Sequence, residues 1–280
     1  MWKTVIIILG IIVILIAVSV TIFSIRFKRK VKKEVIELFG KSGKETKDTV
    51  TENDLKRLPE PVQKYLRYTQ VVGKEKAMTV RLRQNGFFRQ KVGQKWAPLE
   101  AEQYYTTDPP AFIWFGRIMM ASFLSVAARD MYFEGKGNML IKVLSRLTVA
   151  DAKGKDMDEA SLMRFLNEMM WFPSAYLNEY IQWESIDAKS AKAIIHNGGV
   201  NASAVLYFND LGELRNFKGE RFCSITGKRE SWSTPMSEYK EINGLRLPVK
   251  GEGVWNLQSG DFSYIRVEIT DIVYNNPLTY

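Results

Sequence analysis

The sequence predicts an α+β fold, with an N-terminal transmembrane helix followed by a curved antiparallel β-sheet of about ten strands and a long helix on the concave face of that sheet. Three observations predict this arrangement. An uncharged apolar run occupies residues 5–25. From about residue 77 the apolar residues alternate with polar ones, which is the period of a half-buried strand. Around residue 160 the period changes to that of a helix.

The apolar run of residues 5–25 would form a helix of about 31 Å, which is enough to cross a hydrocarbon core of about 30 Å. A cleaved signal peptide is the competing interpretation, with a weak cleavage site at Ala17-Val18-Ser19. The run continues past this site to Ile25 and is followed at once by the basic segment RFKRKVKK. Both features favour a retained single-pass anchor over a signal peptide.

The domain organisation follows from this anchor and from composition. Residues 1–39 are expected to form the transmembrane anchor and a juxtamembrane helix, since apolar residues keep a helical spacing up to Gly40. Residues 40–50 are small, polar and charged, as in a linker. Residues 51–280 are expected to form one β-rich body domain.

The charge of the chain is concentrated at its start. The sequence has 40 basic and 31 acidic residues, for a net charge of +9. Seven of the basic residues and no acid lie in residues 1–33, so the body is almost neutral. A neutral body lacks the basic surface that nucleic acid binding requires. Only one Cys and one His are present, which excludes a disulfide scaffold and a Cys/His zinc site, and no metal or cofactor is expected.

Turn sequences divide the body into strands. Asn85-Gly86, Asn197-Gly198 and Asn243-Gly244 each lie between alternating runs, and this dipeptide is typical of a type I′ hairpin turn. We expect strands over residues 77–84, 87–92, 98–107, 111–120, 126–134, 138–149, 190–196, 200–208 and 213–222, with a final group over 236–273.

One helix interrupts this series of strands. Leu162, Phe165, Leu166, Met169 and Met170 follow the spacing of a wide apolar helix face, and Pro173 is expected to end the helix. Such a Met-rich face predicts a helix that packs across the concave side of the sheet.

The candidate catalytic residues are carboxylates. Asp130 and Glu134 share one face of a predicted strand, and Glu168 follows Arg164 by one helical turn. A pair of carboxylates can act as general acid and base when burial raises the pKa of one of them. The alternative is a solvated strand face and an exposed ion pair on the helix.

Aromatic residues suggest a second kind of site. The strand over 111–120 is apolar on both faces, so something other than solvent must cover each face. The cover could be the Met-rich helix alone, or the helix together with an apolar ligand held in a curved sheet. The candidate ligand-binding residues are Trp114, Phe115, Tyr132, Arg164, Glu168, Trp171, Trp183 and Trp255.

Several stretches of the sequence resemble an uncharacterised family of bacterial membrane-anchored proteins, a domain of unknown function. The stretches are Leu58-Pro59-Glu60-Pro61, Phe112-x-Trp114, Asp130-x-Tyr132-x-x-Gly135-x-Gly137, Arg164-Phe165-Leu166-x-Glu168, Trp171-Phe172-Pro173, Trp183-Glu184 and Gly244-x-x-x-Pro248, together with Trp96, Trp255 and Tyr264. Members of the family tend to have an aromatic residue where this chain has Met236.

The order of strands and helix is also similar to that of lipoprotein carriers, in which helices fill the concave face of a curved sheet. This resemblance implies a lipid or another apolar small molecule as partner. It also implies a body outside the cytoplasm, whereas the basic residues after the span place the body in the cytoplasm, next to a bacterial plasma membrane. The sequence alone does not decide on which side of the membrane the body lies.

Three functions remain in view. The first is a membrane-anchored protein that binds membrane lipid or another apolar ligand in a cleft between sheet and helix. The second is an enzyme that uses the carboxylates of Asp130, Glu134 and Glu168. The third is a protein-interaction module with a closed core.

Overall fold

The computed structural model describes residues 2–43, 47–121 and 124–280, so the linker expected over residues 40–50 lies partly outside the described residues. The helices are α1 (Trp2–Gly40), α2 (Glu52–Leu55), α3 (Glu60–Tyr68) and α4 (Lys155–Glu168), followed by the 3₁₀ turns η1 (Met169–Trp171) and η2 (Pro173–Leu177). The strands are β1 (Thr79–Phe88), β2 (Ala97–Thr107), β3 (Pro110–Ala121), β4 (Leu124–Phe133), β5 (Lys136–Val143), β6 (Leu147–Ala152), β7 (Ile181–Asp187), β8 (Ser190–Asn197), β9 (Val200–Phe208), β10 (Leu214–Cys223), β11 (Lys228–Ser233), β12 (Met236–Ile242), β13 (Leu245–Leu257) and β14 (Gly260–Tyr274).

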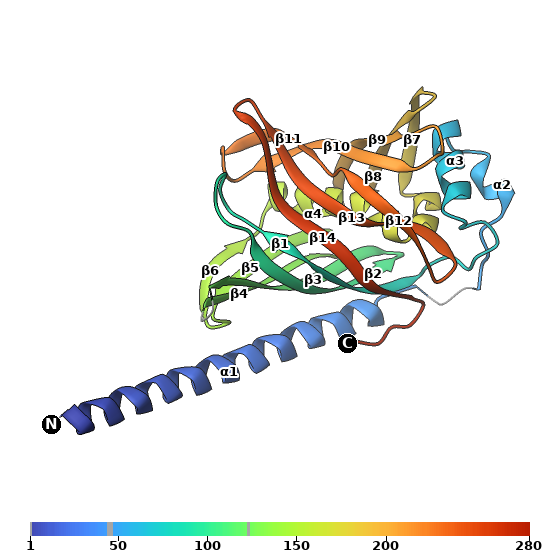
Figure 1. Cartoon of the computed structure of the whole chain (residues 1–280). Helices are drawn as coiled ribbons and strands as arrows, with labels where there is room; N and C mark the ends of the chain where they lie inside the picture. The colour runs from blue at the N-terminus through green and yellow to red at the C-terminus, as the bar shows by residue number, and fades with distance from the viewer. Residues whose placement is uncertain (1, 44–46, 122–123) are drawn as a thin grey trace.

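All of these strands belong to one curved antiparallel sheet (Figure 1). Their order is β6-β5-β4-β3-β2-β1-β14-β13-β11-β10-β9-β8-β7, with β12 paired to β13. The predicted curved antiparallel sheet is therefore confirmed as a half-barrel. The predicted number of about ten strands is wrong, because the described residues form fourteen. The segment expected as one strand over 138–149 forms both β5 and β6, and β7 and β11 were missed.

The Asn-Gly pairs show why part of the strand prediction was wrong. Asn243-Gly244 does join two strands, β12 and β13, and both residues have positive φ (53° and 73°) as a type I′ turn requires. Asn85-Gly86 instead lies inside β1, paired with β2 and β14. A Cβ atom at Gly86 would lie 2.0 Å from the backbone oxygen of Arg266. Glycine is therefore needed there for the close approach of β14, not for a turn.

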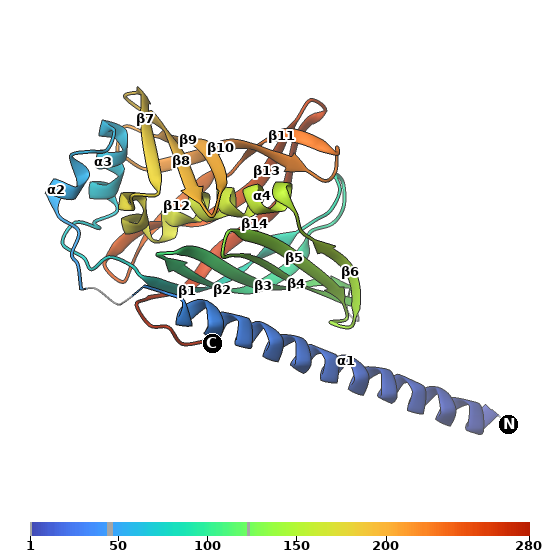
Figure 2. The same cartoon turned by 180° about the vertical axis from the view of Figure 1, so that it is seen from behind.

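The prediction of a long helix on the concave face is also wrong, because the long helix of the structure is N-terminal. That helix is α1, with 39 residues. The segment around residue 160 forms the much shorter α4, of 14 residues, which lies between the two halves of the sheet and contacts β4 and β5 on one side and β9 and β10 on the other (Figure 2). Pro173 has no N–H group to continue a helix, and it begins the 3₁₀ turn η2.

The second half of α1 packs against the outer face of the sheet. Phe27, Val31, Val35, Leu38 and Phe39 are buried against a cluster contributed by β2, β3, β4 and β5. The ring of Phe27 lies edge-on to Phe115 with centroids 5.5 Å apart. An ion pair of 3.4 Å joins Glu34 to the buried Arg129. This contact covers the outer face of β3, which explains why that strand is apolar on both sides.

The first half of α1 projects beyond the body (Figure 1). Most side chains of the apolar run are exposed and none is buried, and α1 is the one helix among the described residues that is long and apolar enough to cross a membrane. The end of this run is held by the body, because the guanidinium of Arg146, between β5 and β6, lies 5.3 Å from the ring centroid of Phe23.

The docking of α1 predicts different effects at two adjacent residues. Val35 is fully buried against the sheet, whereas Ile36 is 60% exposed. Val35→Asp places a carboxylate in that apolar contact. It should therefore lower the free energy of unfolding by about 2 kcal/mol and the Tm by roughly 4–8 °C. Ile36→Asp is the matched control and should leave the Tm almost unchanged in thermal unfolding of the full chain in detergent. Equal losses in the two variants would contradict the docked arrangement.

Candidate functional site

A cavity of about 190 Å³ lies beneath α4, between the two halves of the sheet. Its walls are mainly apolar and come from elements far apart in the sequence. They include Phe88 from β1, Trp114 and Ile118 from β3, Val126 and Ala128 from β4, Met139 and Ile141 from β5, Met170 and Trp171 from η1, Trp232 from β11, and Tyr264, Ile265 and Val267 from β14. An apolar cavity of about 150 Å³ is large enough to hold benzene, so this space can accommodate an apolar group.

The three tryptophans of the cavity have their polar atoms bound inside the protein. The indole N–H of Trp114 donates to Gln84 Oε1 (3.0 Å), that of Trp171 to the backbone oxygen of Pro248 (3.1 Å), and that of Trp232 to the hydroxyl of Tyr264 (3.2 Å). Because these donors are satisfied, the rings present apolar surface to the cavity. The walls therefore favour an apolar occupant over water.

Arg164, Asp130 and Glu168 form a buried cluster of ion pairs at the cavity wall. Arg164 on α4 donates from Nη1 to Asp130 Oδ2 (2.7 Å) and from Nε to Glu168 Oε1 (2.8 Å). Its guanidinium also lies over the rings of Phe112 and Trp114, about 5 Å from each centroid. Asp130 and Glu168 are almost completely buried. Arg164 thus ties α4 to the sheet through β4.

The second carboxylate oxygen of Glu168 is also hydrogen-bonded inside the protein. Glu168 Oε2 accepts hydrogen bonds from Gln103 Nε2 (2.7 Å) and from the hydroxyl of Tyr105 (3.1 Å), both on β2. Burial raises the pKa of Glu168, and Arg164 and these two donors only partly oppose that effect. Burial also raises the pKa of the Tyr105 hydroxyl, which keeps it protonated as a donor. Burial alone would lower the pKa of Arg164, but Glu168 and Asp130 hold it above its ordinary value.

The structure brings together some of the residues predicted from the sequence. Trp114, Arg164, Glu168 and Trp171 line the cavity, and Asp130 contacts Arg164 just behind its wall. These residues come from β3, β4, α4 and η1, so the sheet and the helix meet at this point.

The other predicted residues lie elsewhere. Phe115 is on the outer face, against Phe27, and Glu134 is exposed and paired with Lys41 (2.9 Å). Tyr132 is buried and donates to the side chain of Asn197 (2.9 Å), Trp183 donates to the backbone oxygen of Tyr176 (3.3 Å), and Trp255 stacks on Tyr264. None of these five is part of the cavity wall.

Sequence reasoning missed several residues of the wall, above all Gln84, Arg221 and Trp232. Gln84 continues the buried face of β1 after Val80 and Leu82, so strand alternation could have identified it. The same test places Arg221 on the face of Gly219 and Cys223 in β10. Trp232 lies in β11, a strand that the sequence analysis did not predict.

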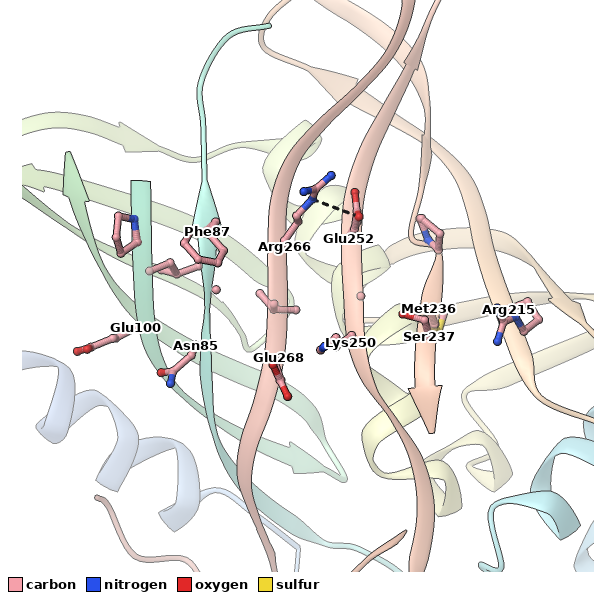
Figure 3. Close-up of a pocket in the computed structure, with 16 residues that line it drawn as sticks. Asn85, Phe87, Glu100, Arg215, Met236, Ser237, Lys250, Glu252, Arg266 and Glu268 are labelled. Carbon is pink, nitrogen blue, oxygen red and sulfur yellow. Dashed lines mark ion pairs between the residues drawn. The ribbon is translucent and has the colours of Figure 1, made fainter. Parts of the chain in front are cut away.

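A second hollow, of about 700 Å³, lies on the outer face of β1, β2, β12, β13 and β14 (Figure 3). It is larger and more open than the cavity, and most of its charged residues form ion pairs with neighbours. Arg266 pairs with Glu252 (3.2 Å) and Lys250 with Glu238 (2.6 Å). Because exposed pairs of this kind are normal on a solvated sheet face, the less open and more apolar cavity beneath α4 is the better candidate site.

The described residues contain no group of three or more His, Cys, Asp or Glu side chains that could hold a metal ion. Two of the three predicted catalytic carboxylates share the cationic Arg164, which occupies the position that a bound cation would take between them.

Comparison with known proteins places the chain in a family. Residues 48–267 match the family described as "Family of unknown function (DUF6544)". The chain belongs to the DUF6544 family. No protein with a curated description matches this DUF6544 chain. The membership confirms the predicted resemblance to an uncharacterised family.

Three solved structures are similar to the chain at low sequence identity. An outer membrane lipoprotein-sorting protein domain from Vibrio parahaemolyticus is 6% identical, with 72% of this chain and 87% of that chain covered and a TM-score of 0.39. A LolA superfamily protein from Nitrosomonas europaea is 9% identical (80% and 91% covered, TM-score 0.35). A DUF1329 family protein from Desulfovibrio piger is 12% identical (79% and 95% covered, TM-score 0.38). The predicted likeness to lipoprotein carriers is confirmed, but at this distance it carries no argument about the ligand.

The raised pKa of Glu168 predicts a specific pH dependence of stability. The pKa of Glu168 is higher in the folded protein than in the unfolded chain, where it is about 4.3. The protonated carboxyl group therefore contributes its full stabilisation of the folded state below about pH 4.3. This contribution is lost as the pH rises through the folded-state pKa. Glu168→Gln replaces the carboxyl group with an amide that does not titrate, so the variant does not lose this stabilisation at higher pH. The Tm of the variant should therefore rise relative to that of the wild type as the pH increases.

Thermal unfolding of the full chain at a series of pH values measures this difference. Gln84→Met is the control, since it changes the same cavity wall without a titrating group and should alter the Tm equally at all pH values. A parallel pH profile for Glu168→Gln and the wild type would show that burial does not govern this carboxyl group.

Proposed function

We propose that this protein is a single-pass membrane-anchored protein that binds a lipid or another apolar molecule in the cavity beneath α4. The observation that carries the proposal is the cavity itself, which is partly open, mainly apolar and lined by tryptophans whose N–H groups are already satisfied. Ligand pockets typically have about 300–1,000 Å³, so a space of about 190 Å³ favours a single chain over a whole phospholipid.

The position of α1 supports the anchored part of the proposal. The exposed run of residues 5–25 has the length of a membrane span, and six basic residues follow it within eight positions. These basic side chains are exposed, whereas Phe27 and Val31 between them are buried on the sheet. The helix therefore continues from the proposed span directly into the body, which would stay within reach of lipid.

A carboxylate-based enzyme is the second candidate, and one observation favours it: Asp130 and Glu168 meet at Arg164, and burial raises the pKa of Glu168 as a general acid requires. Both oxygens of Glu168 are engaged, however, by Arg164 on one side and by Gln103 and Tyr105 on the other. A general acid needs one oxygen free to transfer its proton to the substrate. The arrangement therefore supports a structural role better.

A photoreactive probe tests the binding proposal directly. The full chain in phosphatidylcholine nanodiscs is irradiated with dodecanol that carries a diazirine, and the labelled peptides are mapped by mass spectrometry. The wild type should be labelled on α1 by probe in the bilayer and also on peptides that line the cavity. Ala128→Phe, which fills the cavity from β4, should lose most of the second set of labels.

Met119→Phe is the matched control. Met119 lies on β3 next to Ile118, which lines the cavity, but its own side chain is on the opposite, partly exposed face. Both variants should unfold cooperatively, and only Ala128→Phe should lose the labels of the cavity. Labelling confined to α1 in the wild type would refute the proposed function.

A further inference from the structure

A second arginine, Arg221, lines the cavity from β10. Its guanidinium lies 4.9 Å from the ring centroid of Trp232 and 5.6 Å from that of Trp255, which is opposite Trp232 on the next strand, β13. The side chain is only partly exposed, and its Nε atom is buried without a hydrogen-bond acceptor. The function proposed above makes no use of this cation.

The charge of Arg221 has no partner within the described part of the chain, where it forms neither an ion pair nor a side-chain hydrogen bond. Two carboxylates are candidates for a partner, one opposite Arg221 in the sheet and one on the wall of the same cavity. Glu230 is directly opposite Arg221 on β11, but it pairs with Lys228 (3.4 Å). Glu252 lines the cavity, but it pairs with Arg266 (3.2 Å) and accepts a hydrogen bond from Ser263 (2.6 Å).

Arg221 therefore differs from Arg164, the other arginine of the cavity. Arg164 has two carboxylates and cannot attract an anion, because its immediate surroundings carry a net negative charge. Arg221 has the rings of Trp232 and Trp255 beside it, and the carboxylates near it pair with other residues. A guanidinium that packs against aromatic rings can still use its N–H groups to bind a carboxylate or a phosphate, whose oxygens match its fork of donors.

We propose that Arg221 binds the anionic head of an amphiphile whose apolar chain lies in the cavity beneath α4. The ligand class is thus a molecule with one chain and one terminal anion, either a carboxylate or a phosphate monoester. This inference rests on the proposed function and adds the chemistry of the head group to it.

Competition against the photoreactive dodecanol probe tests the inference. The full chain in phosphatidylcholine nanodiscs is labelled in the presence of dodecanoate, dodecyl phosphate, dodecanol or dodecylamine, each expressed as a mole fraction of the nanodisc lipid. One or both anions should suppress labelling of the cavity at about a tenth of the concentration that dodecanol needs, because a hydrogen bond between two charged groups is stronger than one from the guanidinium to a neutral hydroxyl. Dodecylamine should be the weakest competitor.

Two variants assign this preference to Arg221. In Arg221→Gln, the anions and dodecanol should suppress labelling of the cavity at equal concentrations. Arg221→Lys keeps the charge, so the anions should remain better competitors than dodecanol, by a smaller factor than in the wild type. Arg229→Gln is the matched control, because Arg229 lies on the adjacent strand β11 and is paired with Glu159 (2.7 Å) on the surface. It should behave as the wild type does. Thermal unfolding of each variant verifies that it is folded.

The possible failures are distinguishable. If dodecanol and both anions compete equally in the wild type, or if dodecylamine competes best, the head-group inference is wrong while the cavity still binds apolar chains. If no compound suppresses the labels of the cavity, or if the cavity is never labelled, the proposed function fails as well. Dodecanoate and dodecyl phosphate separate the two kinds of anion.

Discussion

The buried ion pairs of Arg164 are the interaction on which the rest of this structure depends. They hold α4 to β4 through Asp130 and, through Glu168, to the side chains that β2 contributes. Removing one partner of such a pair would leave a buried charge at a cost of about 3–5 kcal/mol, so the helix is fixed relative to the sheet. The space that the surrounding side chains do not fill then remains as the cavity.

The same body has a second fixed contact, on its outer face. Phe27, Val31, Val35 and Leu38 pack the second half of α1 against the sheet, so the run proposed to cross the membrane continues from a helix that is docked on the body. The doubly apolar strand β3 owes its outer cover to α1 and its inner one to α4. Its composition is thus explained without a ligand, and the case for binding depends on the cavity alone.

Much of the fold was predictable from local pattern, and the parts that were not depend on contacts between distant segments. Strand alternation predicted the sheet, and the spacing of Arg164 and Glu168 predicted their pairing. The dipeptide Asn-Gly forms a turn at residues 243–244 but lies within a strand at residues 85–86, because there the backbone of β14 needs the space. In the sequence, nothing distinguishes Arg221 from an arginine on a solvated strand face. Its contacts with Trp232 and Trp255 depend on the pairing of three strands and could not be predicted from local pattern.

The central claim is that the space beneath α4 receives an apolar chain. A crystal structure of the full chain with 12-bromododecanoic acid tests it most directly, because the anomalous signal of bromine locates the end of the chain. The account predicts a bromine peak inside the cavity bounded by Val126 and Trp171, with the carboxylate at Arg221. Bromine only along α1, or a cavity filled by protein side chains, would contradict it.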